Sequence, residues 1–320
     1  MVATPGSSDA TSKSGSAVGA GRSRFIDPAA LARIRSMEVR VRAIMEGFWS
    51  GLHRSSKHGF SSEFSEYRSY VAGDDPRRID WKVLARTDRA YVKRFRDETN
   101  LRAILIVDRS RSMDFLGAAD GQGITKADYA STLASTLAYF LMLQGDAVGL
   151  ATISDGMDGY VPPTSRRSIL PEIIGRLESR PEARTTDLSA ALEDVAAVAK
   201  RRSLFIILSD FLCPIENLRS KLGILAAGGH QAVAVRIEDP VERDLSIDAP
   251  THIRDLETDE QIFLSPDRER DDYLRRYGEH VAALERTCSG WGVDCLTAAT
   301  DRPVELSLHD LVSSRRLAGS

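Results

Sequence analysis

The stretch that most constrains the fold of this chain reads LRAILIVDRSRSM and runs from Leu101 to Met113. Apart from one arginine, its residues up to Val107 are apolar and mostly branched, as in a parallel strand that is buried on both faces. The apolar run stops at Asp108. Because open α/β sheets bind ligands beyond the carboxyl ends of their strands, we expect a site at this point of the chain.

The polar residues of this loop are spaced two apart, as Asp108, Ser110 and Ser112. One carboxylate and two hydroxyls offer only hard oxygen donors, the ligands that suit Mg²⁺ or Mn²⁺. A plainer interpretation stays open: Asp108 can also cap a helix or accept hydrogen bonds from amides of its own loop.

The Asp-x-Ser-x-Ser spacing after a strand resembles the first motif of the metal-ion-dependent adhesion site of von Willebrand factor A domains. Asp108, Ser110 and Ser112 match that motif residue for residue. The resemblance implies two further ligands, a threonine from a second loop and an aspartate from a third. Thr186, just before a helical pattern, best matches the threonine, and Asp210, after a second buried-strand pattern, matches the aspartate.

Carried over to this chain, the resemblance implies that the hydroxyls of Ser110, Ser112 and Thr186 bind the ion directly. Asp108 and Asp210 would bind it directly or through water. Since Mg²⁺ keeps several exchangeable waters, one coordination position is left for an aspartate or glutamate of a partner protein.

Apolar strand patterns alternate with helical patterns along the rest of the chain, which predicts an α/β fold with a mostly parallel sheet and helices on both faces. The resemblance to von Willebrand A domains implies the doubly wound form of this architecture, to which we add a small N-terminal α+β segment. The expected strands after the first are 147–153, 203–208, 230–237 and 292–296, and the expected helices include 126–143, 169–177, 188–199, 215–226, 273–287 and 304–311.

We divide the chain into three parts. Residues 1–24 are rich in Gly, Ser, Ala and Thr and are predicted to be disordered, because they cannot bury enough apolar surface to offset ordering. Residues 25–98 form an N-terminal segment, with a helix from Pro28 to about Trp49 after the cap Asp27. Residues 99–320 form the von Willebrand A-like domain.

The N-terminal segment contains the block GDDPRRIDWK, from Gly73 to Lys82. Together with the EYR and ART triplets around it, this block resembles the signature of the bacterial family called domain of unknown function fifty-eight. Members of that family are commonly encoded beside AAA+ ATPases of the MoxR type, so the resemblance implies such an ATPase, or its substrate, as partner. Many members carry N-terminal membrane helices, from which this chain departs.

Charged residues of both signs are dense between Glu63 and Arg102, with ten basic and eight acidic side chains interleaved. A phosphate-binding stripe would carry one sign, so this pattern does not favour nucleic acid. Two interpretations stay open: an ion-paired face packed on the second domain, or a docking surface for a protein partner that includes Arg77 and Arg78.

Composition excludes several classes of protein. A formal net charge of −3 gives no basic field for nucleic-acid binding. The three cysteines form no paired framework and are predicted to be free thiols. We find no stretch of about 18 apolar residues that could span a membrane and no secretion signal, and therefore expect a cytoplasmic protein.

The expected function is that of a metal-dependent, protein-binding adaptor rather than an enzyme, with Mg²⁺ or Mn²⁺ as its ion. One alternative is a metal-dependent hydrolase or phosphatase. Phosphatases of the haloacid dehalogenase type need a second aspartate two residues after the first, and Ser110 occupies that position. The other alternative is a structural scaffold without a metal.

Overall fold

The computed structural model describes residues 25–52, 66–69, 86, 91–94, 101–117, 123–179, 188–247, 251–254, 256, 261–314 and 317. Three sequence predictions lie outside these residues: the disordered tail at 1–24, the GDDPRRIDWK block with Arg77 and Arg78, and Thr186.

A six-stranded sheet forms the centre of the molecule, with the strand order β10-β7-β6-β3-β4-β5. Neighbouring strands are parallel except for the edge strand β5, which is antiparallel to β4. Branched apolar residues make β3 and β6 the buried middle of the sheet, and both strands end at the same edge. The strands are β3 (Arg102–Asp108), β4 (Ala147–Ile153), β5 (Met157–Thr164), β6 (Leu204–Ser209), β7 (Gln231–Glu238) and β10 (Asp294–Ala299).

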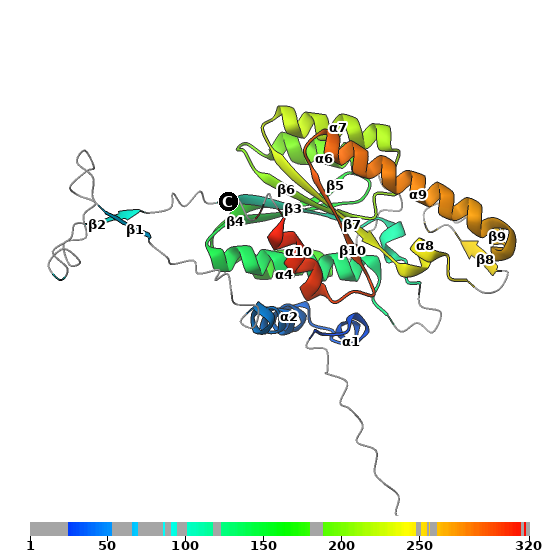
Figure 1. The fold of residues 1–320 in the computed structure, drawn as a ribbon, viewed down its shortest axis with the longest axis horizontal. Coiled ribbons are helices and arrows are strands. Elements are labelled where there is room, and N and C mark those ends of the chain that lie inside the picture. Colours follow the sequence, from blue (N-terminus) through cyan, green and yellow to red (C-terminus); the bar gives the residue numbers. More distant parts are fainter. Residues whose placement is uncertain are drawn as a thin grey trace, which may run out of the picture.

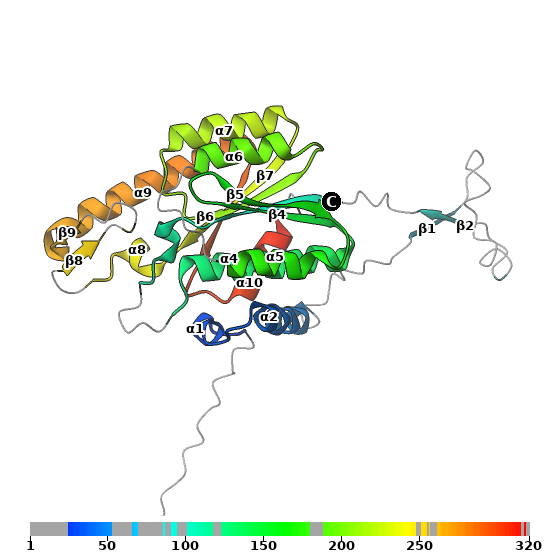
Figure 2. The same cartoon turned by 180° about the vertical axis from the view of Figure 1, so that it is seen from behind.

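Helices cover both faces of this sheet (Figures 1 and 2). Alternate residues of β3 enter two separate cores, Leu105 and Val107 on one face and Ile104 and Ile106 on the other. The doubly wound α/β fold expected from the sequence is therefore confirmed. The first face carries α4 (Lys126–Gln144), α5 (Ile169–Glu178) and α10 (Val304–Ser313), and the second carries α6 (Leu188–Val198), α7 (Ile215–Ala227) and α9 (Pro266–Gly290).

The prediction of a single N-terminal helix from Pro28 to about Trp49 is wrong. The structure has two helices here, α1 (Pro28–Ala32) and α2 (Met37–Leu52). The buried side chain of Arg40 explains the break. Its guanidinium donates to the carbonyl oxygens of Ile34 (2.6 Å) and Ala32 (3.4 Å), and so satisfies them in place of helical amides. Both helices share the core of the first face, so α1 and α2 pack directly on the α/β layer.

The remaining described elements are short. A 3₁₀ turn, η2 (Arg111–Asp114), follows β3, and α8 (Pro240–Asp244) follows β7. Two antiparallel hairpins pair β1 (Glu66–Ser69) with β2 (Tyr91–Arg94) and β8 (Thr251–Arg254) with β9 (Gln261–Leu264). The three cysteines are free thiols, as predicted. Within the described ranges, no helix combines the length and the apolar character needed to cross a membrane.

Candidate metal centre

Asp108 ends β3 and is buried, with only 2% of its surface exposed. Its Oδ1 accepts a hydrogen bond from the amide of Ser110 (2.9 Å), and its Oδ2 accepts one from the hydroxyl of Ser209 (2.5 Å). The plainer interpretation of Asp108, as an acceptor for its own loop, is thus correct for one oxygen. The second bond comes from the end of β6, which lies beside β3 in the sheet.

The hydroxyl oxygens of Ser110 and Ser112 lie 3.0 Å apart at the start of η2. Two adjacent ligands of an octahedral Mg²⁺, each about 2.1 Å from the ion, are separated by roughly the same distance. A hydroxyl keeps lone pairs available while it makes one hydrogen bond. These two side chains therefore fit a magnesium-type ion by chemistry and by spacing.

Asp210 follows β6 and also has both carboxylate oxygens bonded. Its Oδ1 accepts from the amide of Leu212 (3.1 Å), and its Oδ2 accepts from the ammonium of Lys126 (2.9 Å). The residue between, Phe211, has a left-handed backbone (φ 54°), which is uncommon for a large side chain. Its amide donates to Ser209 Oγ (2.9 Å), and its carbonyl accepts from His280 Nε2 (2.9 Å), so the loop is held in this conformation.

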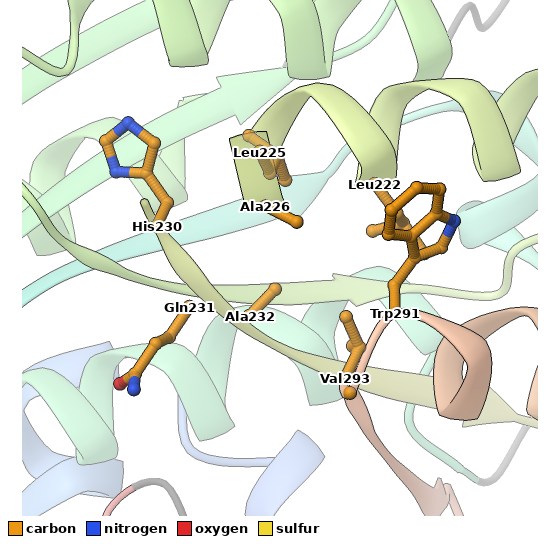
Figure 3. Close-up of a pocket in the computed structure, with 9 residues that line it drawn as sticks. Leu222, Leu225, Ala226, His230, Gln231, Ala232, Trp291 and Val293 are labelled. Carbon is orange, nitrogen blue, oxygen red and sulfur yellow. The ribbon is translucent and has the colours of Figure 1, made fainter. Parts of the chain in front are cut away.

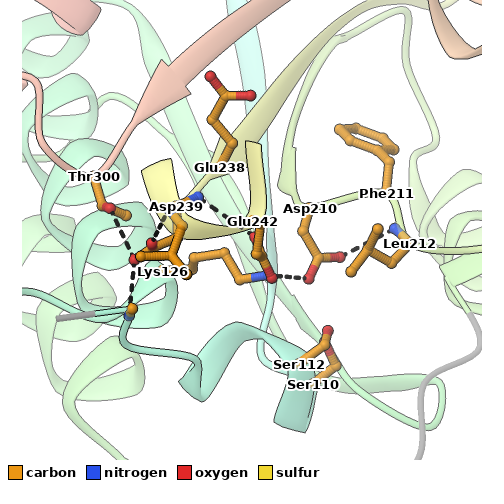
Figure 4. Close-up of polar contacts among 12 residues, drawn as sticks. Ser110, Ser112, Lys126, Asp210, Phe211, Leu212, Glu238, Asp239, Glu242 and Thr300 are labelled. Atoms are coloured by element: carbon orange, nitrogen blue, oxygen red, sulfur yellow. Dashed lines mark hydrogen bonds and ion pairs between the residues drawn. The ribbon is translucent and has the colours of Figure 1, made fainter. Parts of the chain in front are cut away.

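Lys126 is fully buried, and its ammonium bridges two carboxylates (Figure 4). The Nζ atom lies 2.9 Å from Asp210 and 2.6 Å from Glu242. Burial on its own lowers the pKa of Lys126, but the negative charges of Asp210 and Glu242 outweigh burial and raise this pKa above its ordinary value. The Lys126 side chain is therefore positively charged at neutral pH, beside Asp210.

Glu242 is held in place by the helix that carries it. A capping box starts α8: Asp239 Oδ1 accepts from the amide of Val241 (2.9 Å), and Glu242 Oε2 accepts from the amide of Asp239 (3.4 Å). Asp239 Oδ2 also accepts from the amide of Gly117 (3.1 Å), which ties α8 to the loop after η2. The Glu242 carboxylate is thus aimed at Lys126 by backbone contacts (Figure 4).

The negative charges at this edge of the sheet are only partly compensated. The pKa of Asp108 is raised to about 6, first by burial and then by the negative charge of Asp210, although hydrogen bonds from Ser209 and Ser110 lower it. A divalent ion between the two aspartates would offset this repulsion. The donor set and the excess negative charge both fit such an ion.

Of the predicted site residues, the structure brings Asp108, Ser110, Ser112 and Asp210 together where β3 and β6 end. Figure 4 shows Ser110 and Ser112 beside Asp210. Their role as metal ligands stays a prediction. No group of three or more His, Cys, Asp or Glu side chains forms a metal cage within the described part of the chain, so an ion here would need the serine hydroxyls.

Sequence reasoning missed three residues of this centre: Ser209, Lys126 and Glu242. A signal for Ser209 existed, since it directly precedes Asp210 at a strand end and is a serine within a buried run. Lys126 and Glu242 gave no signal, because a lysine and a glutamate in the first turn of a helix usually face solvent.

A small hollow at the opposite edge of the sheet offers no comparable site (Figure 3). It lies where β7 begins, beside α7 and the turn before β10. Most of its lining residues are apolar, His230 and Gln231 are the polar ones, and Trp291 lies at its rim. Trp291 packs over Gly223, where a Cβ atom would lie 2.9 Å from the indole ring.

A doubly wound sheet with one antiparallel edge strand, and with Asp108, Ser110 and Ser112 after its central strand, defines a von Willebrand A-like protein. Within that class, the chain belongs to the family described as "Protein of unknown function DUF58", which it matches over residues 66–283. The resemblance seen in the sequence is confirmed by this match.

Relatives with curated sequences are uncharacterized proteins of mycobacteria. One from Mycobacterium tuberculosis is 30% identical over 294 residues, which cover 91% of this chain and 91% of the relative. One from Mycobacterium avium is 33% identical over 131 residues, which cover 41% of this chain and 76% of the relative.

The chain also has some similarity to two solved structures. Protein BatB from Bacteroides thetaiotaomicron is 14% identical and has a TM-score of 0.43, with 69% of this chain and 100% of that chain covered. The VWA domain of SpRpn10 is 14% identical and has a TM-score of 0.38, with 66% of this chain and 95% of that chain covered.

Proposed function

We propose that this chain is a protein-binding module that captures a carboxylate of its partner through a bound Mg²⁺ or Mn²⁺ ion. The observation that carries this proposal is the pair of serine hydroxyls, 3.0 Å apart, beside two buried carboxylates. When bound, the ion supplies a Lewis-acidic coordination position that an aspartate or glutamate of the partner can enter.

The hydrogen bonds of the site support different roles for its residues. Ser110 and Ser112 hold the ion directly in this proposal, together with Thr186 by family resemblance. Each oxygen of Asp108 and Asp210 already accepts a bond from the protein. We therefore assign these aspartates to orienting the waters of the ion and to balancing its charge.

Calorimetric titration with Mn²⁺ and Mg²⁺ tests the metal half of the proposal. We expect one site per chain in the wild type, and loss of binding in Ser110→Ala and in Asp108→Ala. Ser154→Ala is the matched control, because Ser154 is also a buried serine beyond a strand of this edge but bonds Asp158. Absence of heat with folded wild-type protein would leave only the scaffold alternative.

For the partner, we propose a MoxR-type AAA+ ATPase or one of its substrates, on the basis of family resemblance alone. Two contacts of different kind make this proposal testable by co-purification. Asp108→Ala or EDTA should weaken capture at any ionic strength. Reversal of Arg77 and Arg78 to glutamate should weaken a contact that depends strongly on salt, because exposed charges are screened over about 8–10 Å at physiological ionic strength.

The result that contradicts this partner is equally concrete. Co-purification with the ATPase that survives EDTA and the double arginine reversal together, or that never occurs, overturns it. Metal binding without ATPase binding would retain the metal-dependent module and reject only this partner.

A further inference from the structure

The position of Lys126 is not explained by the helix that it starts. Lys126 is the first residue of α4, after the cap Thr125, and a cation is unfavourable at the positive end of a helix. It is also fully buried, which is costly for an ammonium without partners. Its carboxylate partners, Asp210 and Glu242, compensate for this placement, with the ring of Phe115 5.6 Å from Nζ as a weaker partner.

Charge offers a reason for the arrangement. Asp108, Asp210 and Glu242 are three carboxylates, and Lys126 is the ammonium bonded to two of them, which gives the cluster a formal net charge of −2. A divalent ion therefore offsets the excess negative charge of these four side chains.

We propose that Lys126 is a positioning residue that limits the negative charge of the metal centre, so that the metal-loaded centre accepts a partner carboxylate with less repulsion. This inference rests on the metal-dependent function proposed above. Lys126 does not touch the ion in this arrangement. It holds Asp210 by a direct bond and balances Glu242, which α8 holds beside it.

The proposal predicts opposite changes in two affinities. In Lys126→Met the cluster becomes more negative, so it binds a cation more tightly but repels an incoming carboxylate once loaded. In Glu242→Gln the cluster becomes less negative, so both changes reverse. Combining the two substitutions restores the original charge and should restore both affinities. A residue with a merely structural role would lower both affinities together.

The experiment uses the full chain at pH 8. Mn²⁺ alone is titrated first, with the free ion measured by electron paramagnetic resonance. Acetate is then titrated into Mn²⁺-loaded protein, with loss of bound water measured by proton relaxation. Relative to wild type, K126M should bind Mn²⁺ on the order of tenfold more tightly and acetate on the order of tenfold more weakly. This magnitude is expected when one charge is removed several ångströms from the bound ion in a partly screened site.

Every outcome decides the matter. Opposite shifts in K126M, reversed in E242Q and cancelled in the double variant, support the proposal. If K126M fails to fold, E242Q and the double variant decide, because Glu242 is only half-buried and a glutamine keeps its shape. Parallel or absent shifts overturn the role of Lys126 while the metal site stands. Wild-type protein that binds no Mn²⁺ overturns the proposed metal function as well.

Discussion

At the scale of single residues, the hydrogen bonds of three serines organise the candidate metal centre. Ser110 and Ser112 face one another, whereas Ser209 donates to Asp108 and accepts from the amide of Phe211. Ser209 therefore joins the two aspartate loops and supports the left-handed backbone of Phe211. Without its hydroxyl, a buried carboxylate and a buried amide would each lose a partner.

We therefore expect Ser209→Ala to lower the free energy of unfolding by about 1–3 kcal/mol, the range for leaving a buried polar group unsatisfied. Urea denaturation measures the change. The matched control is Ser135→Ala, since the buried hydroxyl of Ser135 has no hydrogen-bond partner among the residues that the structure describes, and alanine favours the helix. A loss in Ser135→Ala as large as that in Ser209→Ala would contradict this reading of the two serines.

The raised pKa of Asp108 makes stability depend on pH in a defined direction. Its pKa is about 6 in the folded protein, against 3.8 as the ordinary value, so the folded state binds the proton more tightly than the unfolded state. The resulting stabilisation is fully present below pH 3.8 and is lost as pH rises through 6. Metal-free wild type should thus lose stability between pH 4 and 6.5 relative to Asp108→Asn.

Chemical denaturation of both proteins at several pH values, with EDTA present, measures this difference. Comparison with Asp108→Asn cancels the contributions of Glu242, Asp146 and Glu305, whose pKa values are also raised, chiefly by burial. Parallel pH profiles of the two proteins would show that Asp108 keeps an ordinary pKa.

At the scale of elements, the sequence predicted what depends on local patterns. The apolar runs at 101–107 and 203–208 predicted β3 and β6, and the residues after them predicted Asp108 and Asp210 at one edge. The break between α1 and α2 was missed because it depends on Arg40, whose polar side chain turns inward to two carbonyls. The ion pairs of Lys126 were missed for a related reason. Their partners, Asp210 and Glu242, lie 84 and 116 positions further along the chain.

The packing of α2 provides a prediction at this scale. Phe48 is buried in the core of the first face, and its ring contacts Phe140 of α4 edge to face, with centroids 5.8 Å apart. Phe48→Ala should lower the free energy of unfolding by about 3–5 kcal/mol, the usual range for such a cavity. Val39 of the same helix is 52% exposed, so Val39→Ala should cost no more than about 0.5 kcal/mol.

Thermal and urea unfolding of these two variants measure how much α2 contributes to the stability of the α/β layer. A small effect of Phe48→Ala would mean that α2 contributes little to the stability of the α/β layer. It would then favour treating residues 25–98 as a separate unit.

At the scale of the whole molecule, the candidate centre connects parts of the chain that are far apart in sequence. Asp108 and Ser209 join the ends of β3 and β6, Lys126 adds α4, and Glu242 adds α8. Because β3 and β6 are the buried middle strands, opening this edge would disturb both cores. We therefore expect an ion bound there to stabilise the whole cooperative unit rather than one loop.

The last prediction follows from this connection. Mg²⁺ at a hundredfold excess over its Kd should raise the free energy of unfolding by about 2.7 kcal/mol, which is the mass-action value for a ligand of the native state. For a domain of this size the melting temperature should rise by roughly 5–10 °C. Ser110→Ala should abolish the rise, and Ser154→Ala should retain it. Hydrogen exchange then locates the effect: added protection along β3, β4 and β6 is expected, whereas protection confined to η2 and residues 210–212 would mean that the ion stabilises only its own loops.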